Sequence, residues 1–253
     1  MGQMRDKPYE LNLDDIKSKI EKFNKSLIYL AGDYLTAQHF RTPDIKNAGL
    51  TAASVILIDS LWQTQLYRQK KDYCAIKQII KELKKNWNTI LYCFNKLNNI
   101  TITGNPEAIQ KASEQIFPIV LDATENKNYS FATKLFHWYM PEHFPIVDKW
   151  SRKGISIFQN NRKTQKGMRI PKTMPTGDNI ENRLNDYCRI IHFYSDILNS
   201  FKNNQVNDLL KFDYRTQQPT NLKRQNKILR ILDKYFFMLG NTKKHVVNLR
   251  NCT

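Results

Sequence analysis

Apolar residues recur every three or four positions along most of this 253-residue chain, which is the spacing of an amphipathic helix. A first helix is predicted over residues 12–31. Thr42-Pro43-Asp44 then combines a capping hydroxyl with a proline, which is typical of a helix start. The helix that follows is unusually apolar through residues 52–58, so we expect it to lie centrally. The apolar face of the first helix is formed by Ile16, Ile20, Phe23, Leu27 and Leu30.

The same spacing continues through the rest of the chain. It predicts helices at about 74–97, from Pro106 onward with a kink near Phe117-Pro118, at 179–201 and at 221–239, with a short strand suggested only at 100–102. Eight glycines fit helices better than a many-stranded sheet with glycine-rich turns. With no internal repeat or clear linker, we predict one all-α unit over residues 1–253, built as two lobes that meet near residues 129–154.

Residues 129–154 form the stretch around which the chain is organised. They predict a short amphipathic helix ending before Pro141, a tight turn, an extended segment over 144–147 and a second helix. Asp148 stands at the start of that second helix, where a carboxylate accepts hydrogen bonds from free backbone N–H groups. Two interpretations stay open: Asp148 is only a helix cap, or it places one negative charge where a polyanion binds. Its cationic neighbours in sequence are Lys134, Lys149, Arg152 and Lys153.

The net charge of +17 and a pI near 9.7 indicate a polyanionic partner, with nucleic acid the first candidate and an anionic membrane surface the second. No apolar run approaches the roughly 18 residues that span a bilayer. The first ten residues lack the apolar core of a signal peptide, so we expect a cytoplasmic protein. The four cysteines are scattered without a CxxC pair, so we expect reduced thiols and no metal or cofactor.

Two parts of the chain resemble the helix–hairpin–helix DNA glycosylase superfamily. In that family an aspartate follows an apolar Pro-Ile/Val segment and begins a helix, and Pro145, Ile146, Asp148 and Arg152 match this pattern. The Gln/Thr-rich end of the apolar helix, over 57–65, resembles the family's earlier signature. The resemblance covers roughly residues 45–158. It leaves 159–179 as a basic loop and 180–253 as C-terminal helices.

The resemblance implies a DNA glycosylase that flips a damaged or modified base out of the duplex and hydrolyses its N-glycosidic bond. Asp148 would stabilise the positive charge that develops on the sugar, or activate the attacking water. The chain departs from the family by lacking a glycine at 128–133 and the iron–sulfur cysteines of one branch. We therefore expect a specialised member that excises a bulky base, such as glucosylated hydroxymethylcytosine in phage DNA, for antiviral defence.

The resemblance also assigns other residues. Lys134, fourteen residues before Asp148, is near the Schiff-base lysine of bifunctional members, although an exposed helix lysine touching phosphate explains it equally well. Trp62, His137 and Trp138 would form the base pocket, unless Trp62 is core and His137 structural. We expect a monomer that binds duplex DNA through Gln63, Thr64, Tyr129, Ser130, Lys149, Arg152, Lys153, Arg162 and Lys163.

Two other functions compete with the glycosylase. A non-catalytic helical DNA-binding protein would use the same basic surface, and replacing Asp148 by Asn would then change nothing, because Asn caps helices about as well. A peripheral membrane or partner-binding protein would need a basic amphipathic helix, and the sequence offers no convincing one.

Overall fold

The computed structural model describes residues 9, 11–41, 44, 46–62, 64, 66, 74–123, 128–161, 169–175, 179–202 and 204–241. Within these ranges all regular elements are helical, which confirms the all-α prediction, and no helix is long and apolar enough to cross a membrane. The elements are α1 (Leu13–Asn24), α2 (Leu27–His39), α3 (Ala48–Trp62), α4 (Cys74–Lys85), α5 (Trp87–Leu97), α6 (Pro106–Leu121), α7 (Tyr129–Tyr139), α8 (Lys149–Asn161), α9 (Ile180–Asn199), α10 (Gln205–Thr216), the 3-10 turn η4 (Thr220–Leu222) and α11 (Ile228–Gly240).

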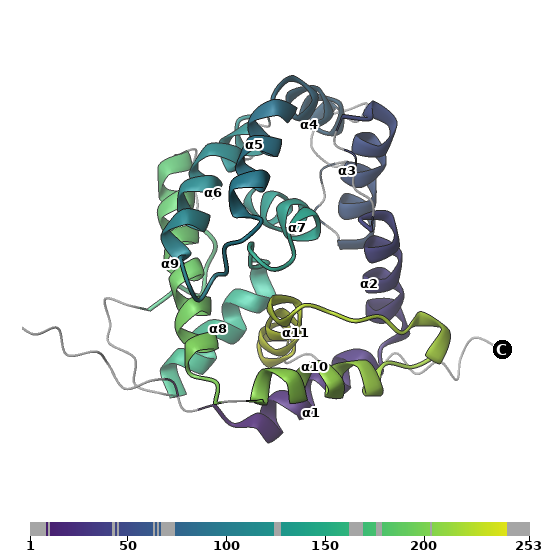
Figure 1. Cartoon of the computed structure of the whole chain (residues 1–253), viewed down its shortest axis with the longest axis vertical. Helices are drawn as coiled ribbons and strands as arrows, with labels where there is room; N and C mark the ends of the chain where they lie inside the picture. The colour runs from purple at the N-terminus through teal and green to yellow at the C-terminus, as the bar shows by residue number, and fades with distance from the viewer. Residues whose placement is uncertain are drawn as a thin grey trace, which may run out of the picture.

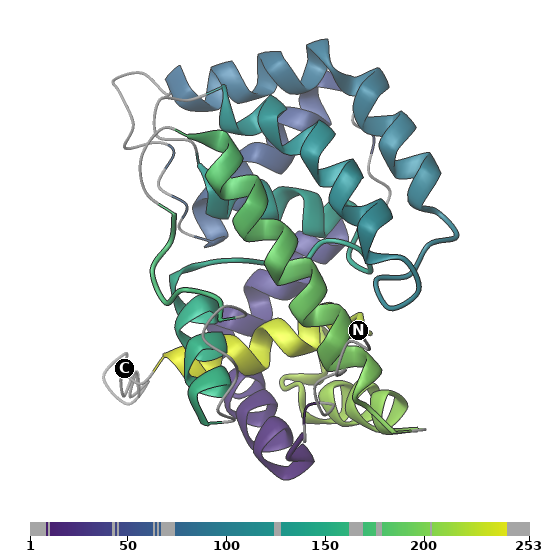
Figure 2. The same ribbon diagram turned by 90° about the vertical axis from the view of Figure 1, so that its left-hand side faces the viewer.

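The helices form two groups in space (Figure 1). In the first, α6 packs on α4, α5, α7 and α9, while α3 packs on α4 and α7. In the second, α11 packs on α8, α1 and α10. Helix α2 contacts α1 on one side and α3 on the other, and the long α9 runs from the first group toward the second (Figure 2).

Several predicted helix boundaries are wrong. The helix expected over 12–31 is interrupted between α1 and α2, where the buried Asn24 side chain donates to the Asp213 side chain of α10 at 3.1 Å. The helix expected over 74–97 breaks at Asn86, whose side chain donates to the Glu82 carbonyl at 2.9 Å. Residues 100–102 lie in a turn region rather than a strand, α10 was not predicted, and α11 begins only at Ile228.

The predicted sequence of helix, turn, extended segment and helix over 129–154 is confirmed. However, α7 is buried on every side from Phe131 to Tyr139, so it is not amphipathic. Two contacts fix its register against the extended segment. Thr133 Oγ1 accepts from the Val147 N–H at 3.1 Å, and the His137 ring lies 2.7 Å from the Phe144 carbonyl. Residue 148 is therefore held beside the middle of α7.

Helices α8 and α11 cross at very close range through two glycines. A Cβ atom on Gly154 would lie 1.9 Å from the Phe236 carbonyl oxygen, and one on Gly240 would lie 1.9 Å from the Trp150 carbonyl oxygen. Both obstacles are backbone atoms, which cannot rotate away. The start of α8 therefore lies against the last turn of α11.

Gly154→Ala and Gly240→Ala should each lower the free energy of unfolding by about 2–3 kcal/mol, because the added methyl group forces the two helices apart. Gly32→Ala is the matched control: Gly32 lies within α2, and a Cβ there meets nothing within 4 Å. That change should raise stability by about 0.5–1 kcal/mol through the lower entropy of the unfolded chain. Urea unfolding measures all three; equal effects at the three positions would contradict the close crossing.

Candidate active site

Lys134 and Asp148 meet in the folded protein. The Lys134 Nζ atom lies 3.5 Å from Asp148 Oδ2. Lys134 comes from the middle of α7 and Asp148 from the residue before α8, so the register of these two elements sets the distance. The side chains are 6 % and 17 % exposed, respectively. The pair is therefore mostly shielded from water, with the carboxylate the more accessible partner.

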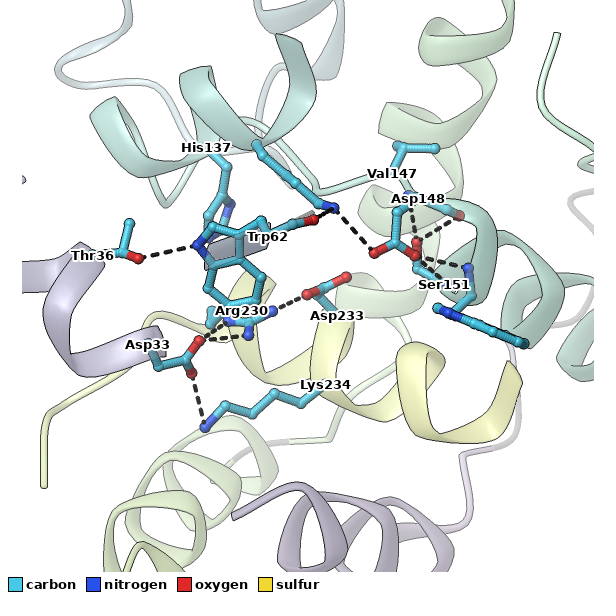
Figure 3. Close-up of polar contacts among 12 residues, drawn as sticks. Asp33, Thr36, Trp62, His137, Val147, Asp148, Ser151, Arg230, Asp233 and Lys234 are labelled. Carbon is cyan, nitrogen blue, oxygen red and sulfur yellow. Dashed lines mark hydrogen bonds and ion pairs between the residues drawn. The ribbon is translucent and has the colours of Figure 1, made fainter. Parts of the chain in front are cut away.

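Asp148 is held by the first turn of α8. Its Oδ1 atom accepts from the N–H groups of Trp150 at 2.8 Å and Ser151 at 2.9 Å, and Ser151 Oγ accepts in return from the Asp148 N–H at 2.9 Å (Figure 3). This reciprocal cap satisfies free N–H groups, and the positive end of the helix dipole favours a carboxylate there. Because only Oδ1 forms the cap, Oδ2 remains directed at Lys134.

Lys134 is held by the C-terminal end of α3. Its Nζ donates to the carbonyl oxygen of Trp62, the last residue of α3, at 3.2 Å. The last carbonyls of a helix lack partners within the helix and form the negative end of its dipole, so they favour a cation. A buried lysine needs such partners. The arrangement places an amine and a carboxylate side by side in a fixed geometry.

The aromatic residues expected to form a base pocket have structural partners. Trp62 is half-buried, its Nε1–H donates to Thr36 Oγ1 at 3.0 Å, and the Arg230 guanidinium lies 4.8 Å from its ring. Trp138 is buried, with Arg224 4.9 Å from its ring. His137 is fully buried, and burial lowers its pKa to about 3, so its ring is neutral. These contacts agree with the core interpretation of Trp62 and the structural interpretation of His137, and Trp138 is buried. The Trp62 carbonyl oxygen borders the Lys134–Asp148 pair.

A buried charge cluster beneath Trp62 was not predicted from the sequence. Arg230 of α11 donates to Asp33 of α2 and to Asp233 of its own helix, and Lys234 lies 3.5 Å from Asp33 Oδ2 (Figure 3). Lys234 also donates to Asp213 of α10 at 2.8 Å. The signal that could have revealed this cluster is the pattern Arg230, Asp233, Lys234, in which three charges share one helix face inside an otherwise apolar segment.

The Arg152 side chain is not available for the phosphate contact expected from the sequence. Its side chain is fully buried and donates to both carboxylate oxygens of Asp186 on α9, at 2.5 and 3.0 Å. The Tyr129 hydroxyl donates to the same carboxylate at 3.0 Å, so Tyr129, also buried, is equally unable to reach a phosphate with its side chain. Both residues fasten α7 and α8 to α9.

The other predicted DNA contacts are spread more widely. Lys149 is exposed, Lys153 is half-buried, and their Nζ atoms lie 5.4 and 5.7 Å from the centre of the Trp150 ring. Ser130 is half-buried, and the Thr64 hydroxyl donates to Asp59 at 2.6 Å. Gln63, Arg162 and Lys163 lie outside the described residues.

Among the residues that the structure describes, no group of three or more His, Cys, Asp or Glu side chains could hold a metal ion. Comparison of the chain with protein families, curated proteins and solved structures finds no match. Function is therefore inferred from the geometry of the Lys134–Asp148 pair and its surroundings.

Arg152→Met should lower the free energy of unfolding by about 3–5 kcal/mol, because it leaves the Asp186 carboxylate buried without its cation. The double variant Arg152→Met/Asp186→Asn should recover part of this loss, since the buried charge is then gone. Lys149→Ala, which removes an exposed cation from the same helix, should change stability by less than about 0.5 kcal/mol. Chemical denaturation tests this; an Arg152→Met protein as stable as the wild type would restore the DNA-contact interpretation.

Proposed function

We propose that this protein is a DNA glycosylase that extrudes a base and cleaves its N-glycosidic bond, with Lys134 and Asp148 as its catalytic residues. The observation that carries the proposal is the 3.5 Å approach of Lys134 Nζ to Asp148 Oδ2. A lysine and an aspartate in this sequence order, the aspartate at a helix start after an apolar Pro-Ile-Val run, also agree with the helix–hairpin–helix glycosylase resemblance.

The position of the pair supports the same function. Lys134 belongs to α7 in the first group of helices, and Asp148 opens α8 in the second (Figure 1). We interpret the two groups as the two lobes of a glycosylase-like fold, with the pair at their junction. The exposed Lys149 and the half-buried Lys153 lie on the first turns of α8 beyond Asp148. Cations there would bind phosphates beside the reacting sugar and contribute affinity without sequence preference.

The geometry suits the chemistry of N-glycosidic cleavage. Positive charge develops on the sugar as the base leaves, and a carboxylate fixed at a helix start stabilises that charge without having to reorganise. A neutral Lys134 amine can attack the anomeric carbon and form a covalent intermediate, which permits strand scission. We therefore propose a bifunctional enzyme. The substrate, a damaged or bulky modified base such as glucosylated hydroxymethylcytosine of phage DNA in an antiviral role, rests on the resemblance alone.

A non-catalytic DNA-binding protein is the second candidate, and one observation favours it. Asp148 Oδ1 forms a complete helix cap, which is by itself a sufficient structural reason for an aspartate at this position. In that case Lys134 would only neutralise the cap. Variants that preserve the cap or the cation while removing the chemistry separate the two functions.

Asp148→Asn should abolish base excision while leaving DNA binding intact. The Asn side-chain oxygen still accepts from the Trp150 and Ser151 N–H groups, so the cap is kept and only the negative charge is lost. The test incubates both proteins with duplexes carrying damaged or phage-type modified bases and reads abasic sites by alkaline strand cleavage. We expect a loss of about 100-fold or more. Equal DNA binding by both proteins with no abasic sites from wild type on any substrate would support the binding protein instead.

Lys134→Arg separates a nucleophile from a structural cation. Arginine retains the charge that pairs with Asp148, but it cannot be deprotonated in a protein and so cannot attack the sugar. We expect this variant to fold, to bind DNA and to form no covalent adduct when borohydride is added. A Lys134→Arg protein that excises bases as fast as wild type would show that Lys134 contributes only charge. Thermal unfolding of each variant controls for loss of structure.

A further inference from the structure

A second carboxylate, Asp233 of α11, lies in the same buried region as the Lys134–Asp148 pair. Figure 3 shows Asp33, Arg230 and Asp233 in a row below Trp62. Asp233 is 3 % exposed, and its Oδ2 atom accepts from the Arg230 guanidinium. Its Oδ1 atom is buried and has no hydrogen-bond partner among the residues that the structure describes. The Oδ1 atom of Asp233 can therefore accept a proton or a hydrogen bond without breaking the contact between Oδ2 and Arg230.

Asp233 lies three residues before Phe236, whose carbonyl oxygen meets Gly154 of α8 at the close crossing of the two helices. Charged or titratable groups that act on Asp233 come from every neighbouring element. They are Arg230 on α11, Asp33 on α2, Lys134 on α7, Asp148 before α8 and Tyr194 on α9.

These surroundings cause the Asp233 carboxyl group to change its protonation state near neutral pH. Burial, with added repulsion from Asp148 and Asp33, raises the pKa of Asp233 to about 7, even though Arg230 and Lys134 oppose the rise. The group is therefore protonated below about pH 7 and ionised above it. Asp33 also accepts from Arg230, but its pKa is shifted in the other direction. The positive charges of Arg230, Lys234 and Arg224 outweigh the effect of burial, so the pKa of Asp33 is lowered and the group stays ionised.

The proposed chemistry needs a proton acceptor beside Lys134. The Lys134 ammonium donates to the Trp62 carbonyl and pairs with Asp148 Oδ2, and an ammonium has no electron pair with which to attack carbon. Asp148 Oδ1 already accepts two backbone N–H groups. In the proposed mechanism Asp148 stabilises the positive charge on the sugar. A second carboxylate could then accept the Lys134 proton while Asp148 stays ionised.

We propose that Asp233 is the proton acceptor that converts Lys134 to its reactive amine, an inference that rests on the glycosylase function proposed above. The Lys134 ammonium gives one proton to the unpartnered Oδ1 atom of the Asp233 carboxylate. Lys134 Nζ then forms a bond to the anomeric carbon of the sugar. The N-glycosidic bond breaks, its electron pair leaves with the base, and the base takes the proton that the newly bonded Lys134 nitrogen loses. The sugar ring then opens, its ring oxygen takes the proton that Asp233 received, and the resulting Schiff base is the species that borohydride reduces. Asp233 acts through Lys134, so it is a positioning residue.

The test measures single-turnover rates of borohydride-trapped adduct formation from about pH 5.5 to about pH 9, using the full chain and a modified-base duplex on which wild type is active. Wild-type rates should rise about tenfold per pH unit up to about pH 7 and then level off. Asp233→Asn, which retains a hydrogen bond to Arg230, should lose this rise and be about 100-fold slower at about pH 8. Asp233→Glu should restore part of the pH-dependent rise.

Asp33→Asn is the matched control. It removes the other carboxylate that holds Arg230, and with it a partner of Lys234, so it should also cost stability. The pH-dependent rise should remain but move to lower pH, because Asp33 no longer repels the charge of Asp233. The proposal is overturned if wild type forms an adduct and Asp233→Asn has the same rate and pH profile, a result that leaves the glycosylase proposal standing. If wild type forms no adduct on any substrate, both the nucleophilic glycosylase and this inference fall.

Discussion

A buried lysine needs partners for its charge, and this requirement organises the centre of the protein. Lys134 sits on a helix that is buried on all sides, and it finds a helix C-terminal carbonyl and a capping carboxylate. The negative end of α3 and the positive end of α8 thus face each other across one ion pair. The end of α3 favours the Lys134 cation and the start of α8 favours the Asp148 carboxylate, so the pair is held without relying on a long, flexible surface contact.

Specific contacts fix the positions of the helices around this pair relative to one another. Thr133 and His137 lock α7 to the extended segment, the Arg152–Asp186 pair fastens α8 to α9, and two glycines seat α8 directly on α11. These contacts fix an amine and two carboxylates with little freedom, which is the condition under which fixed charges assist a reaction. The same close packing is costly to alter, because backbone atoms meet at the glycine positions.

The part of the site that is local in sequence was predictable. The helix, turn and extended segment over 129–148 and the capping position of Asp148 follow from proline, spacing and capping rules that act over a few residues. Lys134 could be named from the resemblance, but its contact with Asp148 requires the register that Thr133 sets. Helix breaks at Ser26 and Asn86 were missed because the apolar spacing continues through both.

The errors concern partners that lie far apart in the sequence. In the sequence, Arg152, four residues after Asp148, resembles a phosphate contact, but the fold brings Asp186, thirty-four residues away, against it. Arg230 and Asp33 are separated by 197 residues, so nothing local indicates that they pair. A run of basic residues cannot by itself distinguish a solvated cation from a buried one, because the acid that neutralises it is chosen by the fold.

The most direct test of the proposed chemistry is to locate the covalent adduct. Wild-type protein would be trapped with borohydride on a modified-base duplex, digested, and mapped by mass spectrometry. We predict that the reduced sugar is attached to Lys134 Nζ, the amine that Asp148 and the end of α3 hold in place. An adduct on any other amine, or base excision with no adduct at all, would contradict the assignment of Lys134 as the nucleophile.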